Sequence, residues 1–154
     1  MKTVLETTVR VTPAQEKTNL VLPFALAEEA RQLKIIYSYA PKLLDGEAAA
    51  EAAENCLLRD AGEYRAQYPA AETFLPLKNL ITLSLDDPNG YRGAAHRQAD
   101  SQVHIVTETT ASHGFSAGKL PAGEWRLVLN VHALVTPFCD CRVKIEVEEV
   151  VGNG

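Results

Sequence analysis

The stretch from Leu80 to Val147 restricts the fold more than any other part of the chain, because it alternates apolar and polar residues in short runs. Gly, Pro and Asn separate these runs, and such residues favour turns. The last run, 139–148, places Cys, Val and Ile on one face and Asp, Arg, Lys and Glu on the other. Strict alternation of this kind is typical of a half-buried β-strand.

The same alternation recurs in other parts of the chain. Clear runs cover 5–11, 33–39, 81–86 and 125–133, and weaker runs cover 19–26 and 103–107. Several short strands separated by turn residues are typical of a sandwich or barrel. The sequence therefore predicts an all-β fold, an antiparallel two-sheet β-sandwich of about seven to nine strands that is jelly-roll-like.

One segment, Asp45 to Tyr68, breaks the alternation because it is rich in Ala and Glu and has no β-branched residue. Its apolar residues recur every three or four positions, as on one face of a helix. Asp45 is suited to the N-cap, and Pro69 is expected to end the segment. We therefore expect one inserted α-helix at about 45–68, lying across one sheet or one end of the sandwich.

Length and charge restrict the class of protein. A chain of 154 residues with 46% hydrophobic content fits one domain, so we expect a single sandwich domain over 1–150 and a frayed tail at 151–154. The net charge of −5 argues against a nucleic-acid partner, which would require a basic face. Because no apolar run approaches the length of a signal peptide or a membrane span, we expect no membrane partner and a cytoplasmic location.

The three cysteines predict reduced thiols in such a location. No Cys-x-x-Cys pair occurs, so the spacing disfavours structural zinc, and we expect neither a cofactor nor a bound metal. Cys139 and Cys141 fall on the apolar face of their run and are expected in the core. Trp125, which alternates with leucines, is expected there too.

Several strings in the sequence resemble a known family. They are LPFALAEEARQLKIIYSYAPK, LDDPNGYRG, GKLPAGEWRLVLNVHALV and CRVKIEVE, within 22–42, 85–93, 118–135 and 141–148. They resemble the N-terminal β-sandwich that precedes the catalytic domain in metallohydrolases of the polymerase and histidinol phosphatase group. The resemblance implies a jelly-roll-like accessory module whose partner is a metallohydrolase catalytic domain. The His-x-His pair that begins the metal site of that group is absent here, so the resemblance carries no hydrolase activity over to this chain.

The loop-rich region from Tyr91 to His113 holds the candidate ligand-binding residues. These are Tyr91, Arg92, His96, Arg97 and His113. Arginine offers a planar fork for carboxylates or phosphates, and tyrosine offers a face for stacking. The alternative is that these are solvated loop residues whose arginines pair with surface carboxylates for about 0–1 kcal/mol.

Two metal sites are alternatives to this cluster. His96 and His113 with a cysteine make a conceivable zinc site, although their spacing does not support one. Asp86, Asp87 and Asn89 make a conceivable calcium site, but Asp-Pro-Asn-Gly is a complete turn without any ion. The turn is therefore the preferred interpretation.

No complete catalytic constellation is present in the sequence, so we expect a protein that is not an enzyme. The favoured hypothesis is a non-catalytic binding or accessory module for carbohydrates or small anions, acting with a separate metallohydrolase. A second hypothesis is a structural or oligomerisation module that uses the edge strand Thr3 to Val11 or the apolar stripe of the helix. A third is a small metal-dependent hydrolase built on His96 and His113.

Overall fold

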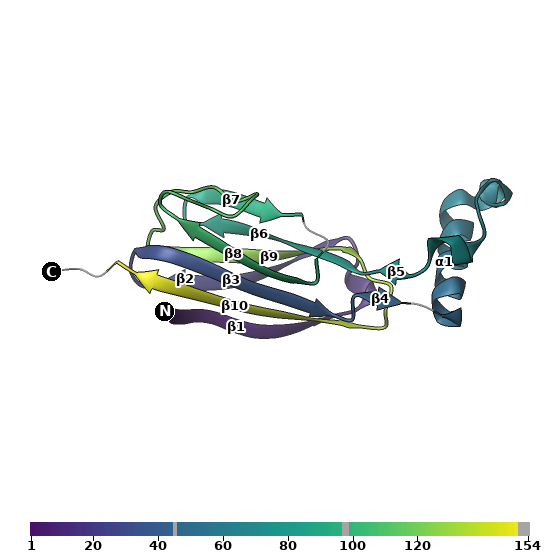
Figure 1. Cartoon of the computed structure of the whole chain (residues 1–154), viewed down its shortest axis with the longest axis horizontal. Coiled ribbons are helices and arrows are strands. Elements are labelled where there is room, and N and C mark those ends of the chain that lie inside the picture. The colour runs from purple at the N-terminus through teal and green to yellow at the C-terminus, as the bar shows by residue number, and fades with distance from the viewer. Residues whose placement is uncertain (45, 97–98, 151–154) are drawn as a thin grey trace.

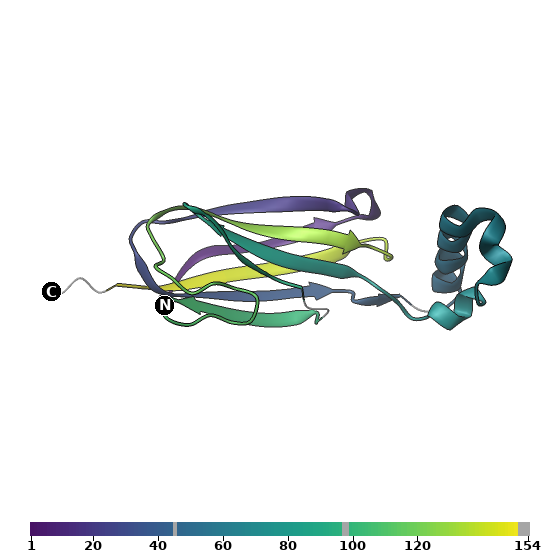
Figure 2. The same cartoon turned by 90° about the horizontal axis from the view of Figure 1, so that it is seen from above.

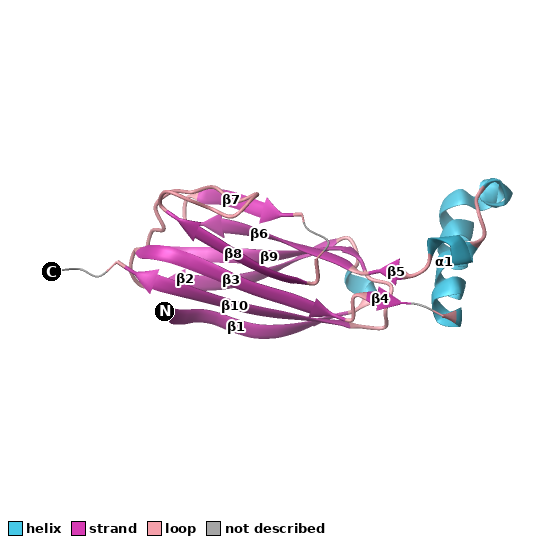
Figure 3. Cartoon of the chain, in the orientation of Figure 1, coloured by secondary structure: helices cyan, strands magenta, loops and turns pink. Residues whose placement is uncertain are grey.

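The computed structural model describes residues 1–44, 46–96 and 99–150, so the tail predicted at 151–154 lies outside the described residues. Two four-stranded sheets pack face to face (Figure 1 and Figure 3). Sheet A contains, in spatial order, β1 (Lys2–Val11), β10 (Cys139–Glu149), β3 (Ala30–Ala40) and β8 (Ser101–Thr107). Sheet B contains β2 (Thr18–Leu26), β9 (Gly123–Ala133), β6 (Leu80–Asp87) and β7 (Gly90–Ala95).

The strand order of the two sheets is that of a jelly roll. Counted along the chain, the eight sandwich strands lie in the orders 1-8-3-6 and 2-7-4-5, and every hydrogen-bonded neighbour is antiparallel. Such an arrangement brings the first and last strands together, here β1 against β10. The predicted two-sheet, jelly-roll-like sandwich is confirmed.

The inward faces of the two sheets form one hydrophobic core. Trp125 and Leu127 on β9 and Tyr37 on β3 are all fully buried, as their alternation predicts. The Trp125 indole stacks on Phe24 with 6.0 Å between ring centroids, and its N–H donates to the Pro121 carbonyl at 3.0 Å. Burial of each large apolar side chain of this kind contributes roughly 1.5–3 kcal/mol.

The inserted helix is shorter than predicted. Helix α1 covers Glu47–Ala61, and residues Gly62–Gln67 and Ala71–Phe74 form short 3₁₀ helices, η2 and η3. Gly62 takes a positive φ of 55°, which ends the α-helix seven residues before Pro69. The expected N-cap, Asp45, lies outside the described residues. No helix in the described ranges is long and apolar enough to cross a membrane.

The helical segment projects from one end of the sandwich instead of covering a sheet. A two-stranded ribbon of β4 (Leu43–Leu44) and β5 (Leu77–Lys78) connects it to β3 and β6. Figure 1 and Figure 2 both place α1 beyond the end of the two sheets. We call residues 43–78 the helical arm. Its position corrects one of the two expected placements, a helix laid across a sheet.

Candidate functional site

Arg92, one of the predicted ligand-binding residues, lies buried beneath the connection from β8 to β9. Its guanidinium donates to the carbonyl oxygens of Ser116, Gly118 and Lys119 and to the carboxylate of Asp87, at 2.8–3.2 Å. An arginine has five N–H donors, and these five contacts occupy them all. Arg92 therefore fastens the connection to sheet B and has no donor left for a ligand.

The alternative interpretation of Arg92, a weak surface ion pair, is also revised. The side chains of Arg92 and Asp87 are each 8% exposed. Breaking a buried pair leaves an uncompensated charge, which costs about 3–5 kcal/mol. The second Asp87 oxygen accepts the Asn89 backbone N–H at 2.6 Å, so the predicted Asp-Pro-Asn-Gly turn is confirmed.

The remaining predicted ligand-binding residues divide between two ends of β7. Tyr91 is 68% exposed near the start of the strand, whereas His96 follows its last residue, roughly 16 Å away at the rise of a strand. His96 and His113 line one hollow of about 170 Å³ together with Ala94, Ala95 and Gly114. Arg97 lies outside the described residues. Of the four that are described, the structure brings only the two histidines together.

The other two histidines have structural partners. His104 is buried in sheet A, where its ring packs 5.0 Å from that of Phe115 and its Nε2 lies 2.8 Å from the Gln102 side-chain oxygen. His132 is exposed, and its Nε2 lies 2.8 Å from the Thr82 hydroxyl. Within the described residues, no group of three or more His, Cys, Asp and Glu side chains is placed to hold a metal ion.

The two cysteines of β10 are both in the core, as predicted. Hydrogen bonding with Cys139 and burial raise the pKa of the Cys141 thiol well above its usual range, which keeps it protonated. The Cys139 thiol donates to the Pro41 carbonyl at 3.5 Å. A buried, protonated thiol is inert, so Cys141 acts as a packing residue of the core.

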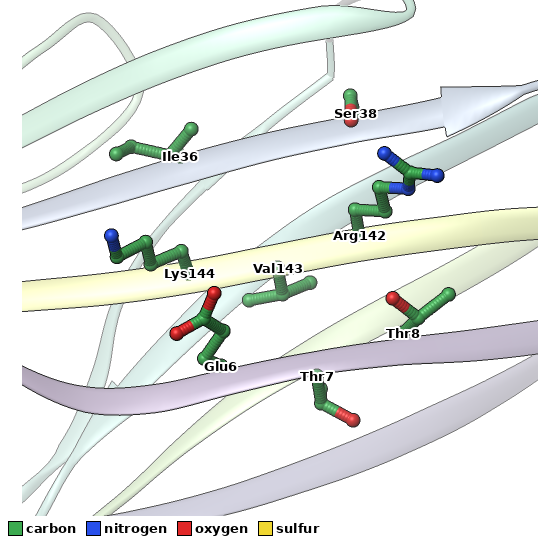
Figure 4. Close-up of a pocket in the computed structure, with 8 residues that line it drawn as sticks. All are labelled: Glu6, Thr7, Thr8, Ile36, Ser38, Arg142, Val143 and Lys144. Atoms are coloured by element: carbon green, nitrogen blue, oxygen red, sulfur yellow. The ribbon is translucent and has the colours of Figure 1, made fainter.

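A hollow larger than the one between the histidines lies on the outer face of sheet A. It has a volume of about 550 Å³, and Figure 4 shows its lining residues on three neighbouring strands. The strand register places Arg142 of β10 between Thr8 of β1 and Ser38 of β3, and it places Lys144 between Glu6 and Ile36 in the next row. A second hollow of about 300 Å³ continues from Ser38 and Arg142. We call this surface the sheet A groove.

The side chains that line the groove include two cations, Arg142 and Lys144, and one carboxylate, Glu6. The carboxylate nearest to Arg142 along its own strand belongs to Asp140, and the Arg10 guanidinium donates to both Asp140 oxygens at 2.8 and 3.0 Å. That contact holds the pKa of Asp140 below its usual range, with a smaller contribution from Arg142. Among the described residues, neither Arg142 nor Lys144 forms a hydrogen bond or an ion pair through its side chain.

The sequence alone indicates the two basic residues of this groove but not the residues beside them. Alternation in 139–148 places Arg142 and Lys144 on the polar face of their strand. The flanking hydroxyls come from β1 and β3, which are more than 100 residues away along the chain. Because strand order is a long-range property, local patterns did not reveal that these side chains share one surface.

Comparisons with known proteins give no family. No family model and no curated protein matches this chain. One solved structure with some similarity is the crystal structure of GEBA250068378 from Sulfurospirillum deleyianum, with a TM-score of 0.33 and 9% sequence identity over 95% of this chain and 99% of that chain.

Proposed function

We propose that this chain is a non-catalytic binding module that takes a small anionic ligand in the sheet A groove. The observation that carries the proposal is Arg142, an exposed guanidinium between two hydroxyl-bearing side chains with no protein partner among the described residues. A guanidinium binds carboxylate or phosphate through two parallel hydrogen bonds. Thr8 and Ser38 supply further donors and acceptors on either side.

Size supports the groove over the histidine hollow. Sites for small molecules occupy about 300–1,000 Å³, and the groove has about 550 Å³ whereas the His96–His113 hollow has about 170 Å³. The groove also has no aromatic side chain with an exposed face among its eight lining residues. Neutral sugars are commonly held by stacking on such faces, so the composition favours a ligand held by its charge, such as a sugar acid or a sugar phosphate.

Calorimetric titration with glucuronate and glucose tests this proposal, because the two ligands differ only in a carboxylate that replaces a primary alcohol. We expect glucuronate to bind in low-salt buffer and glucose to give no measurable heat. Arg142→Gln should weaken glucuronate binding by about tenfold or more, since a charged hydrogen bond contributes roughly 1.5–3 kcal/mol.

Arg126→Gln is the matched control, because Arg126 is an exposed arginine on the outer face of sheet B. It should leave glucuronate binding unchanged. Equal weakening by both substitutions would indicate general charge attraction, and equal binding of the two sugars would remove the anionic specificity; either result contradicts the proposal.

The accessory part of the proposal assigns the chain a separate metallohydrolase as its partner and a cytoplasmic location. It is supported by the resemblance of the strings around Pro23 and Trp125 and by the reduced thiols in the core. Pull-down of a purified metallohydrolase catalytic domain of the resembling group tests it. Absence of binding at high concentrations of both proteins would contradict the accessory role and leave anion binding untouched.

The helical arm favours a second candidate function, docking onto another protein. Leu58, Tyr64 and Tyr68 are 49–55% exposed and lie close together along the sequence of the arm. Exposed apolar groups of this size mark interaction sites when they cluster. The arm sequence 43–78 contains seven acidic and three basic residues, so the fitting partner has a basic rim around an apolar surface. Tyr64→Ser with Tyr68→Ser should abolish capture of such a partner while the anion titration stays unchanged.

A further inference from the structure

The two sheets have four edge strands, and three of them are protected from pairing with another chain. On β7, the Gly114 carbonyl accepts the Ala94 N–H at 3.1 Å. On β8, the Ile105 carbonyl accepts the Ser112 N–H at 2.8 Å. On β2, Pro23 removes a backbone donor from the middle of the strand. Natural sheets use covering segments and prolines in this way to avoid edge-to-edge association.

The fourth edge, β1, has neither kind of protection. It is ten residues long and contains no proline. On its free side, the described residues offer it no backbone hydrogen bond. Its single irregularity lies between Thr3 and Leu5, so the segment from Leu5 to Val11 is regular strand. An unpaired edge of this length is a template for an added strand.

The residue order of this regular segment is self-complementary about Thr8. If two copies pair antiparallel with Thr8 opposite Thr8, all seven residues from Leu5 to Val11 find partners. Glu6 then lies opposite Arg10 of the second copy, and the reverse pair forms by symmetry. A register centred on Thr7 would place Glu6 opposite Thr8 and lose both pairs. We propose that this protein forms a twofold homodimer by pairing β1 with β1 in the register centred on Thr8.

The charges around β1 support this register. Within one chain, Glu6 has Lys144 as its cross-strand neighbour and Arg10 has Asp140. In the dimer, a row across the joined sheets reads Lys144, Glu6, then Arg10 and Asp140 of the second copy. The signs alternate at every step, so Glu6 and Arg10 each lie between two opposite charges. Opposite charges at facing positions stabilise strand pairs.

The inward face of β1 supplies the apolar part of the interface. Leu5 and Val9 are only partly buried and pack at the margin of the core. In the proposed register, Leu5 faces Val11 of the second copy and Val9 faces Thr7. The outcome is one continuous eight-stranded sheet with an isologous twofold interface. This inference does not rest on anion binding in the groove.

Sedimentation equilibrium of the full chain gives the first test. We expect a concentration-dependent mass that approaches twice the 16.8 kDa of one chain. Glu6→Lys places like charges opposite each other twice, so it should raise the dimer Kd by about tenfold or more. Glu51→Lys makes the same charge change on the exposed face of the arm and should leave the Kd unchanged. A single-chain mass at every concentration would overturn the proposal, as would equal effects of the two substitutions.

Cysteine cross-linking reports the register, even if Glu6→Lys fails to fold. In a Cys56→Ser background, which removes the exposed native thiol, Thr8→Cys places two thiols opposite each other across the twofold axis. Mild oxidation should convert the Thr8→Cys variant to a covalent dimer. Over the same time the Glu6→Cys variant should stay monomeric, because the two copies of residue 6 lie four positions apart along the paired strands. Preferential cross-linking of Glu6→Cys, or of neither variant, would exclude this register.

Discussion

The sandwich and the helical arm are stabilised in opposite ways. In the sandwich, contacts join residues far apart in sequence, such as the Tyr37 hydroxyl that donates to the Ile81 carbonyl at 2.8 Å. In the arm, the best polar contact is the bidentate pair between Arg65 and Glu54, eleven residues apart. Among the arm residues whose burial the structure describes, the buried apolar side chains are all alanines: Ala49, Ala53 and Ala71.

This difference indicates that the sandwich folds as a cooperative unit to which the arm adds little. An arm that contacts mainly itself can open locally without exposing the core. Substitutions in the sandwich should therefore shift the unfolding of the whole protein, whereas substitutions in the arm should change helix content alone. The four predictions below test that separation, in order of decreasing effect on the sandwich.

The largest effect is expected from Arg92→Ala. It removes five hydrogen bonds and leaves the Asp87 carboxylate buried without its counter-charge. The free energy of unfolding should fall by about 3–5 kcal/mol in urea titrations followed by Trp125 fluorescence. Arg126→Ala, on an exposed surface, should change it by about 0.5 kcal/mol or less. A similar small change for Arg92→Ala would refute its role in fastening the connection from β8 to β9.

A smaller loss of unfolding free energy is expected from Asn79→Ala, where the arm joins the sandwich. The Asn79 side chain donates to Pro41 and Thr136 and accepts the Val135 N–H, at 2.7–2.8 Å. Removing it leaves buried donors and acceptors unpaired, which costs about 1–3 kcal/mol. Asn55→Ala, an exposed asparagine of α1, provides the matched comparison and should be neutral in the same titration. Equal losses for Asn79→Ala and Asn55→Ala would mean that the hydrogen bonds of Asn79 do not stabilise the sandwich.

Alkaline pH should weaken the sandwich through its buried tyrosines. Burial raises the pKa of Tyr39 to about 12 and that of Tyr37 further. Above the unfolded value near 10, the unfolded chain releases protons that the folded chain retains, so the free energy of unfolding falls by about 1.4 kcal/mol per pH unit per tyrosine. Lys42 changes the free energy of unfolding in the opposite direction. Burial lowers its pKa, so its contribution to stability rises with pH and stops rising once the pH exceeds the unfolded pKa of 10.5.

Tyr39→Phe should therefore reduce the slope of stability against pH above about 10.5. Tyr64→Phe, which alters an exposed tyrosine of the arm, should retain the wild-type slope. An unchanged slope for Tyr39→Phe would show that Tyr39 ionises as readily in the folded protein as in the unfolded chain.

The smallest effect on the sandwich is expected from Ala53→Pro in the middle of α1. Proline breaks a helix interior at a cost of about 3 kcal/mol, so circular dichroism should show the loss of helix. The Trp125-detected free energy of unfolding should change by no more than about 0.5 kcal/mol. A loss of several kcal/mol would demonstrate that the arm is part of the cooperative unit.

Local patterns predicted the sandwich well, because the alternation of apolar and polar residues can be recognised in each strand separately. The run 139–148 became β10, and the buried faces of Trp125 and Cys139 followed from period two alone. The helix was predicted too long, because its Ala- and Glu-rich composition continues past Gly62, whose positive φ ends α1. Its projection beyond the sandwich depends on the β4–β5 ribbon, and two-residue strands have no sequence period.

The candidate site was less predictable, since it depends on which strands become neighbours. Arg92 and His96 are four residues apart, yet β7 separates their side chains and buries one of them. Thr8, Arg142 and Ser38 come from three distant segments and form one row. The His and Arg residues of the region from Tyr91 to His113 suggested a ligand site, whereas in the structure Arg92 fastens the connection from β8 to β9.

The proposed ligand-binding surface is the outer face of sheet A. Titrating glucuronate into isotopically labelled protein and following backbone amide NMR shifts tests it directly. We expect the largest shifts at Thr8, Ser38 and Arg142, and we expect them to disappear in Arg142→Gln. Largest shifts around His96 and His113 or along the arm, or no shifts at saturating ligand, would contradict it.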